Sequence, residues 1–200
     1  MKAIKSLLTI FLIFNILNGV ASAQSLEEEV KVLTRSLESN LRLIASGKKQ
    51  STEATQIVIE SFILPKIDTK YFSYKVLGKH LKSLSKEQRV EFTSLLTDSM
   101  VKNYISVLKH YNNESLTVEN IRKPQTGKIA KTTIKVSGEG KDKKLVLAWR
   151  FYEESNSWLI FDLEAEGVSL LQSKQKEISY LINKSGVEST LALLREKATS

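Results

Sequence analysis

The residues from Leu64 to Tyr111 constrain the fold most, because they are dense in large apolar side chains and almost empty of catalytic ones. Pro65 breaks the chain near the start of this stretch, and Gly78 predicts the C-terminal cap of a short aromatic helix. Ser85, with Gln88 three positions later, forms a capping box, which predicts a long helix that ends near Tyr111. Apolar residues lie on two sides of that helix, so we expect it to make contacts on two sides.

Apolar residues at helical spacing also predict helices before this stretch. One covers residues 26–46 and is ended by Gly47, and the next covers residues 51–63. The pattern changes after Asn112-Asn113, where apolar and polar residues begin to alternate or β-branched and aromatic residues dominate. Four strands are predicted, over residues 115–122, 129–137, 143–152 and 157–164.

Helical spacing returns over residues 168–184, Gly186 interrupts it, and residues 187–197 form a final short helix. Short turns between the predicted strands indicate an antiparallel meander. Helices, then a meander, then helices again predict an α+β fold with helices laid on one face of the sheet. No internal repeat or long linker divides the chain, so we expect a single domain.

The N-terminus has the three parts of a secretory signal peptide. Lys2 and Lys5 form a basic region, the apolar run from Leu7 to Leu17 follows, and Ala21-Ser22-Ala23 is a small-residue cleavage site. We therefore expect residues 1–23 to be removed and residues 24–200 to form the mature domain. The chain has 0 cysteines, so disulfides cannot stabilise it after export. These features favour the bacterial periplasm.

The net charge of the chain is +8, and the loss of Lys2 and Lys5 with the signal peptide lowers it to +6. This excess has two interpretations, which are solubility and attraction to anionic membrane surfaces or acidic partner proteins. Nucleic acid is not expected as a partner, because export removes the protein from it and the sequence has no RNA-binding signature.

The sequence offers few groups for catalysis or metal binding. Its two histidines, His80 and His110, have no paired metal-ligand spacing, and we expect both at the surface or at helix ends. The glycines of 138–140 join two predicted strands, so they indicate a hairpin turn, whereas a phosphate loop joins a strand to a helix. Asp162 and Glu166 are a possible acid pair, but alternate carboxylates on a strand usually form a solvated face.

Two segments carry a resemblance to a known family. The first lies within residues 64–111 and contains the motifs Leu64–Asp68, Val76–Lys79 and Ser85–Phe92, together with Tyr104 and Tyr111. The second runs from Trp158 to Leu170. Together they resemble the MlaC family, also called the toluene-tolerance family, over nearly the whole mature chain. This chain departs from the family pattern at His80-Leu81 and at residues 173–176, which bears on head-group contacts and on the partner surface.

The resemblance implies an NTF2-like fold, in which a curved sheet and helices enclose an apolar cavity for one glycerophospholipid. It implies a periplasmic carrier that shuttles lipid between an outer-membrane lipoprotein complex and an inner-membrane ABC transporter with an MCE-domain subunit. Such a carrier would maintain the lipid asymmetry of the outer membrane. No cofactor, metal or catalytic group is implied, and we expect a monomer.

Candidate cavity-lining residues are the large apolar side chains of the central helices and strands. They are Leu77, Phe92, Leu95, Leu96, Tyr104, Leu108, Leu147, Trp149, Phe151, Trp158, Phe161, Val168 and Leu171. For each residue alone, plain core packing is the alternative. Tyr104 and Tyr111 would each present a hydroxyl at an apolar wall. We expect Asp162 and Glu166 to be structural, and Ser169 to help cap the last helix.

Two other functions remain open. A secreted enzyme on an NTF2-like scaffold would need a polar pocket with a perturbed acid or base. An envelope interaction protein without a ligand would have a filled core and an exposed apolar patch.

Overall fold

The computed structural model describes residues 25–43, 52–108, 111, 113–123, 127–138 and 140–199. The predicted signal peptide, Ile44, Gly47 and His110 lie outside these residues. The helices are α1 (Leu26–Leu43), α2 (Thr52–Val58), α3 (Thr69–Leu77), α4 (Lys86–Leu108) and α5 (Leu170–Thr199). The strands are β1 (Ser115–Arg122), β2 (Ile129–Ser137), β3 (Lys143–Tyr152), β4 (Ser157–Ala165) and β5 (Val168–Ser169).

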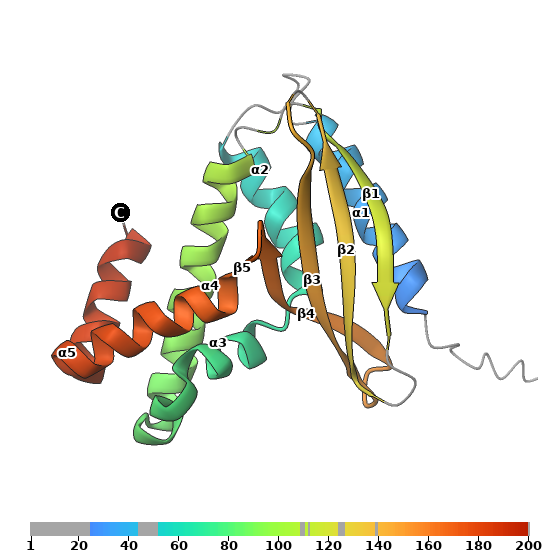
Figure 1. The fold of residues 1–200 in the computed structure, drawn as a ribbon. Helices are drawn as coiled ribbons and strands as arrows, with labels where there is room; N and C mark the ends of the chain where they lie inside the picture. The colour runs from blue at the N-terminus through green and yellow to red at the C-terminus, as the bar shows by residue number, and fades with distance from the viewer. Residues whose placement is uncertain are drawn as a thin grey trace, which may run out of the picture.

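The strands form one antiparallel sheet in the order β1-β2-β3-β4-β5, which confirms the predicted meander (Figure 1). Four strands lie where alternation predicts them, and β4 extends one residue further. Residues 168–169 were predicted as helix, and that prediction was wrong. They form the short strand β5, which pairs with Glu164 and Ala165 after the turn at Gly167.

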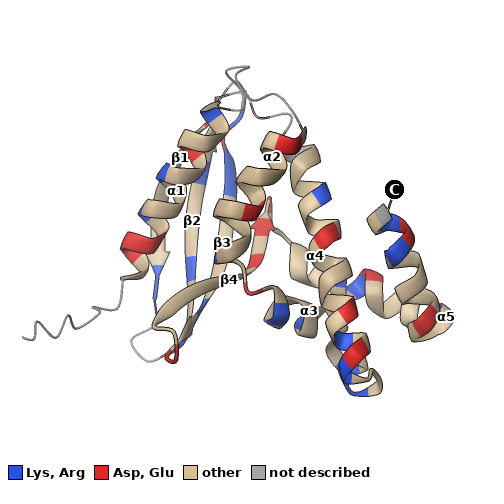
Figure 2. Ribbon diagram, turned by 180° about the vertical axis from the view of Figure 1, so that it is seen from behind, with Lys and Arg blue, Asp and Glu red and all other residues tan. Residues whose placement is uncertain are grey.

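Helix α1 covers the inner face of the sheet, as the view from behind shows (Figure 2). Its buried residues Leu26, Val30 and Leu33 recur every three or four positions, so they form one stripe against the strands. Beneath the helix, the indole N–H of Trp149 donates to the hydroxyl of Thr132 at 2.9 Å, and both side chains are fully buried. This bond satisfies the indole N–H in an otherwise apolar layer.

The predicted helix over 51–63 is only partly regular. Helix α2 passes into a π-helical turn, η2 (Ile59–Ile63), and then into a 3₁₀ turn, η3 (Leu64–Lys66). Pro65 lacks the N–H that would continue the helical ladder, so the chain leaves the helix at this point.

The helical caps predicted from the sequence are present. The hydroxyl of Ser85 accepts from the N–H of Gln88 at 3.2 Å, and the side chain of Gln88 accepts from the N–H of Ser85 at 2.8 Å. Gly78 has φ 52° and its N–H donates to the carbonyl of Tyr74, which ends α3. Helix α5 bends at Gly186, where φ is 80°, as the predicted interruption requires.

The helices α3, α4 and α5 form a second layer, joined to the sheet at the free side of β4 (Figure 1). Ile67 forms a parallel bridge to Ile160, and the N–H of Asp68 donates to the carbonyl of Ile160 at 2.8 Å. The buried carboxylate of Asp68 also caps α3, since it accepts from the N–H of Tyr71 at 2.9 Å. Its second oxygen accepts from the hydroxyl of Tyr152 on β3.

We predict that Asp68→Ala lowers the free energy of unfolding by about 2–3 kcal/mol, because it removes a helix cap and a hydrogen bond to a charged group. Tyr152→Phe should cost about 1–2 kcal/mol, since it removes this second bond and the bond that the hydroxyl accepts from Arg150 at 3.3 Å. Urea unfolding of both single variants and of the double variant measures these losses. The loss in the double variant should be smaller than the sum of the two single losses, and additive losses would show that the two side chains are not coupled.

Candidate functional site

Most of the predicted lining residues of the helices belong to one cluster between α3, α4 and α5, here called the helical cluster. Leu77, Phe92 and Leu96 are buried within it, together with Phe72, Val76, Met100 and Ile178. Leu95 and Leu171 are half-buried and pack against it. The fully buried members therefore act as ordinary core residues, and a ligand can contact only the half-buried ones without rearrangement.

The predicted lining residues of the sheet belong to a different cluster, between α1 and the inner face of the strands. Leu147, Trp149 and Trp158 are buried in this sheet cluster, and Phe151 packs against it with its ring 5.2 Å from that of Trp158. The structure thus divides the predicted lining between two separate apolar clusters.

Three predicted lining residues lie in neither cluster. One of them, Leu108, packs against two smaller clusters, around Ile59 and around Leu41. Phe161 is an extra residue in β4, because Ala148 pairs with Asp162 and Trp149 pairs with Ile160. Its ring meets that of Tyr71 edge-on at 5.4 Å. Val168 is 62% exposed in β5, so the expectation that it closes one end of a cavity is wrong.

A set of half-buried residues, here called the Tyr104 junction, lies where the helical cluster meets a smaller cluster between η2 and α4. It consists of Ile63, Leu64, Tyr104, Leu108, Asp162 and Leu171. Tyr104 packs against the helical cluster and also against Ile59, Val101 and Ile105, which are buried between η2 and α4. Because its large apolar members are not fully covered by protein, the junction is where an apolar ligand finds uncovered surface.

Tyr104 brings a hydroxyl to this junction. Burial, and then the nearby negative charge of Asp162, raise the pKa of Tyr104 to about 12, so the hydroxyl keeps its proton at physiological pH. Within the described part of the chain it makes no hydrogen bond. Tyr111 differs, because its hydroxyl donates to the carbonyl of Glu114 at 2.7 Å. Of the two tyrosines, only Tyr104 keeps its donor available for a ligand.

Asp162 has a structural role, as the sequence predicts. One carboxylate oxygen accepts from the N–H of Leu171 at 2.9 Å, and the other accepts from the hydroxyl of Ser169 at 2.6 Å. The hydroxyl of Ser169 in turn accepts from the N–H of Gln172 at 3.0 Å. These bonds cap α5 and fix it to β4, which leaves this carboxylate poorly placed as a free acid or base.

Two surface hollows differ from the predicted cavity, which stays a prediction. One, of about 490 Å³, lies where Gly78 and His80 approach Gln175 and Ser179 of α5. The other, of about 220 Å³, lies on the outer face of the sheet and includes Arg122 and Glu164. Among the described residues no group of His, Asp and Glu side chains is arranged to hold a metal ion. Within the same ranges, no helix has the length and apolarity of a membrane span.

Sequence reasoning missed some members of the junction. Ile63 and Leu64 lie in the π-helical and 3₁₀ turns, whose geometry helical periodicity does not describe. The Leu-Pro pair at 64–65 is the one signal that the helix changes course there.

We predict that the chain loses stability between about pH 10 and pH 12, and that Tyr104→Phe reduces this loss. The folded state raises the pKa of Tyr104 to about 12, so the fold favours the neutral phenol. This preference contributes up to about 2 kcal/mol to the free energy of unfolding at pH values below the pKa of an unfolded-state tyrosine. The contribution disappears as the pH rises through the pKa of Tyr104 in the folded state. Urea unfolding across this range compares the two proteins. Parallel curves for wild type and Tyr104→Phe would contradict the prediction.

Comparison with known proteins places this arrangement in a family. The model of the MlaC protein family matches residues 34–196. A curated relative, the intermembrane phospholipid transport system binding protein MlaC of Haemophilus influenzae, is 23% identical over 163 residues, which cover 80% of this chain and 76% of the relative. A solved phospholipid-binding protein from Ralstonia solanacearum, in complex with a phospholipid, superimposes with a TM-score of 0.76 at 16% identity, over 85% of this chain and 94% of that one. The chain therefore belongs to the MlaC family.

Proposed function

We propose that this protein is a non-enzymatic carrier that binds a glycerophospholipid in the periplasm and transfers it between membranes. Its membership of the MlaC family supports this proposal, as does its likeness in fold to a protein solved with a phospholipid. On the same grounds we infer that the signal peptide is cleaved. The partners would be an outer-membrane lipoprotein complex and an inner-membrane ABC transporter with an MCE-domain subunit. Transfer between them would maintain outer-membrane lipid asymmetry.

The Tyr104 junction is the observation that carries the proposal. Tyr104 packs against both the helical cluster and the smaller cluster between η2 and α4, and the half-buried Leu64, Leu108 and Leu171 each pack against one of these clusters. Acyl chains would cover the apolar surfaces. The hydroxyl of Tyr104 would donate to an ester or phosphate oxygen, since neither group of a phospholipid carries its own donor.

The energetics of transfer agree with a carrier that performs no chemistry. Burial of a methylene group is worth about 0.8 kcal/mol, so two chains of roughly sixteen carbons gain on the order of 25 kcal/mol relative to water. A bilayer offers the same chains a similar gain. Exchange between bilayer and carrier is therefore nearly balanced, and its direction must come from the partner complexes.

An enzyme on the same scaffold is a weaker candidate. Asp162 is occupied in capping α5, and Glu166 lies exposed in the turn before β5. Neither carboxylate lines either of the two hollows described above, whereas an enzyme of this kind would need its acid or base placed in a pocket.

We predict that the chain purified from a bacterial periplasm contains phospholipid at close to one molecule per protein. Organic extraction followed by mass spectrometry measures the amount and the lipid class. Absence of stoichiometric lipid would count against the carrier and favour an envelope interaction protein without a ligand.

We further predict that Leu108→Trp reduces the bound lipid by about twofold or more, because the indole fills volume at the junction that an acyl chain would occupy. Val90→Trp is the matched control, since Val90 lies on the same helix α4 and is 70% exposed. Circular dichroism would establish that both variants are folded. Equal lipid content in the two folded variants would place the lipid elsewhere.

A further inference from the structure

One part of the helical layer has a large excess of positive over negative side chains. Residues 69–84, which form α3 and the 3₁₀ turn η4 (Gly78–Ser83), contain four lysines and no acidic residue. Residues 170–184 of α5 contain three lysines and one glutamate, Glu177. The two segments pack together in the helical cluster, so their lysines share one region of the molecule (Figure 1).

The surface hollow of about 490 Å³ lies between these two segments. Lys79 and His80 approach it from η4, and Gln175, Lys176, Ser179 and Tyr180 approach it from α5. The side chain of Gln175 donates to the carbonyl of Lys75 at 2.9 Å, and His80 and Ser179 lie within hydrogen-bond distance at 3.1 Å. A Cβ atom at Gly78 would lie 2.8 Å from the amide nitrogen of Gln175, so glycine lets the two walls approach closely. These bonds hold the walls of the hollow in place.

The lysines at this hollow are not neutralised by the protein. Lys79 and Lys176 are exposed, and neither forms an ion pair within the described ranges of the chain. The acidic residue nearby, Glu177, is paired with Lys174 at 2.8 Å and with Lys197 at 3.6 Å. Tyr180 is 62% exposed, and the ammonium of Lys184 lies 5.7 Å from the centre of its ring. Lysine and tyrosine side chains of this kind are favoured where a protein meets a lipid head-group layer.

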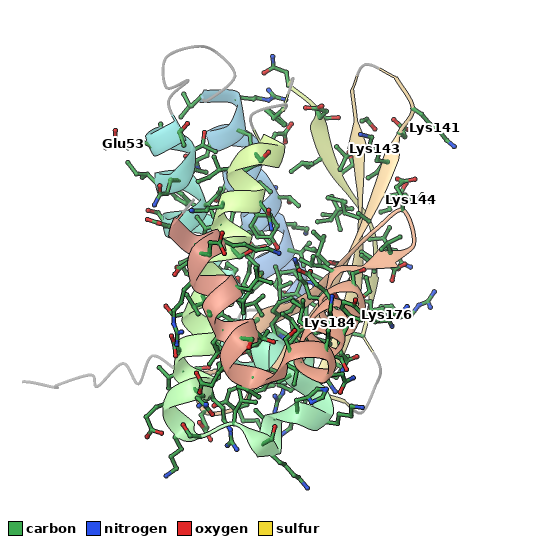
Figure 3. All side chains as sticks on the ribbon, turned by 90° about the vertical axis from the view of Figure 1, so that its left-hand side faces the viewer. Glu53, Lys141, Lys143, Lys144, Lys176 and Lys184 are labelled. Carbon is green, nitrogen blue, oxygen red and sulfur yellow. The ribbon has the colours of Figure 1, made fainter. Side chains whose placement is uncertain are left out.

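A second group of lysines lies on the same side of the molecule. Figure 3 shows Lys141, Lys143 and Lys144, from the β2–β3 hairpin, on the same side of the molecule as Lys176 and Lys184, whereas Glu53 lies on the opposite side. All five of these lysines are exposed, and among them Lys144 has a carboxylate partner, Glu119, at 3.4 Å. We call the surface formed by Lys79, Lys141, Lys143, Lys144, Lys176 and Lys184 the basic face.

We propose that the basic face binds anionic phospholipid bilayers, with a lipid head-group phosphate received by the hollow between Lys79 and Lys176. A bilayer fits better than an acidic protein, because the charge is spread over two separate elements and the exposed Tyr180 lies beside Lys176 and Lys184. The attraction is that of a polybasic surface for anionic lipid. This binding goes beyond the proposed cargo, since it uses exposed residues outside the Tyr104 junction and needs no lipid inside the protein.

Sedimentation of the purified chain with lipid vesicles tests the proposal. We expect it to bind vesicles of phosphatidylcholine mixed with phosphatidylglycerol and to leave vesicles of phosphatidylcholine alone in the supernatant. Lys79→Gln/Lys176→Gln should weaken partitioning to the anionic vesicles by about 25-fold, since each lysine near an anionic surface contributes about fivefold. Higher salt should weaken the binding of the wild type, because the charges are exposed.

The charge-matched control is Lys31→Gln/Lys128→Gln, which removes two lysines from α1 and from the residue before β2. It should bind anionic vesicles nearly as well as the wild type. Equal losses in the two double variants, or equal binding to both kinds of vesicle, would overturn the proposal. A wild type that ignores anionic vesicles but binds polyglutamate would also overturn it and indicate an acidic protein partner. The lipid content of each variant, measured in parallel, separates failure of this docking surface from failure of the carrier function.

Discussion

The attachment of the helices to the open side of β4 is the constraint on which the rest of the structure depends. The carboxylates of two aspartates form this attachment. Asp68 caps α3 beside Ile160, and Asp162 caps α5 from within β4. Both helices therefore start at fixed points on one strand. Arg150 reinforces the first attachment, since its guanidinium lies 4.4 Å from the ring of Tyr71. Hydrogen bonds at the helix ends therefore join the two layers.

This mode of attachment explains why the apolar interior is divided. The stripe of α1 closes the sheet cluster, and contacts among α3, α4 and α5 close the helical cluster, so each is stable by its own packing. Tyr104 and Leu108 of α4 pack against a smaller cluster between η2 and α4, and neither side chain is fully buried. A fold held in this way can keep uncovered apolar surface in its interior without the loss of either core.

Much of the fold could be predicted because its signals are local. Alternation and turn residues predicted the four long strands, and a capping box placed the start of α4. The candidate site was predicted less well, because its geometry depends on pairing between distant segments. No local pattern indicates that Ile67 bridges to Ile160, or that Phe161 is the extra residue of a bulge. Asp68 did carry a signal, since an acidic residue before an apolar helix is a common cap. Val168 was misassigned because an apolar residue at helical spacing was assumed to point inward.

The proposed cargo site and the proposed docking surface place opposite demands on one small domain, and the fold separates them. Acyl chains need surface that is apolar and shielded, and the half-buried residues of the Tyr104 junction would supply it. Attraction to a bilayer needs charge that stays solvated, which Lys79 and Lys176 provide at the hollow between η4 and α5. Since each exposed lysine contributes only about 1 kcal/mol near an anionic surface, and salt screens it, such contact is weak enough to be released. A carrier must leave each membrane as readily as it arrives, so a few unpaired lysines suit this role better than a buried apolar interface would.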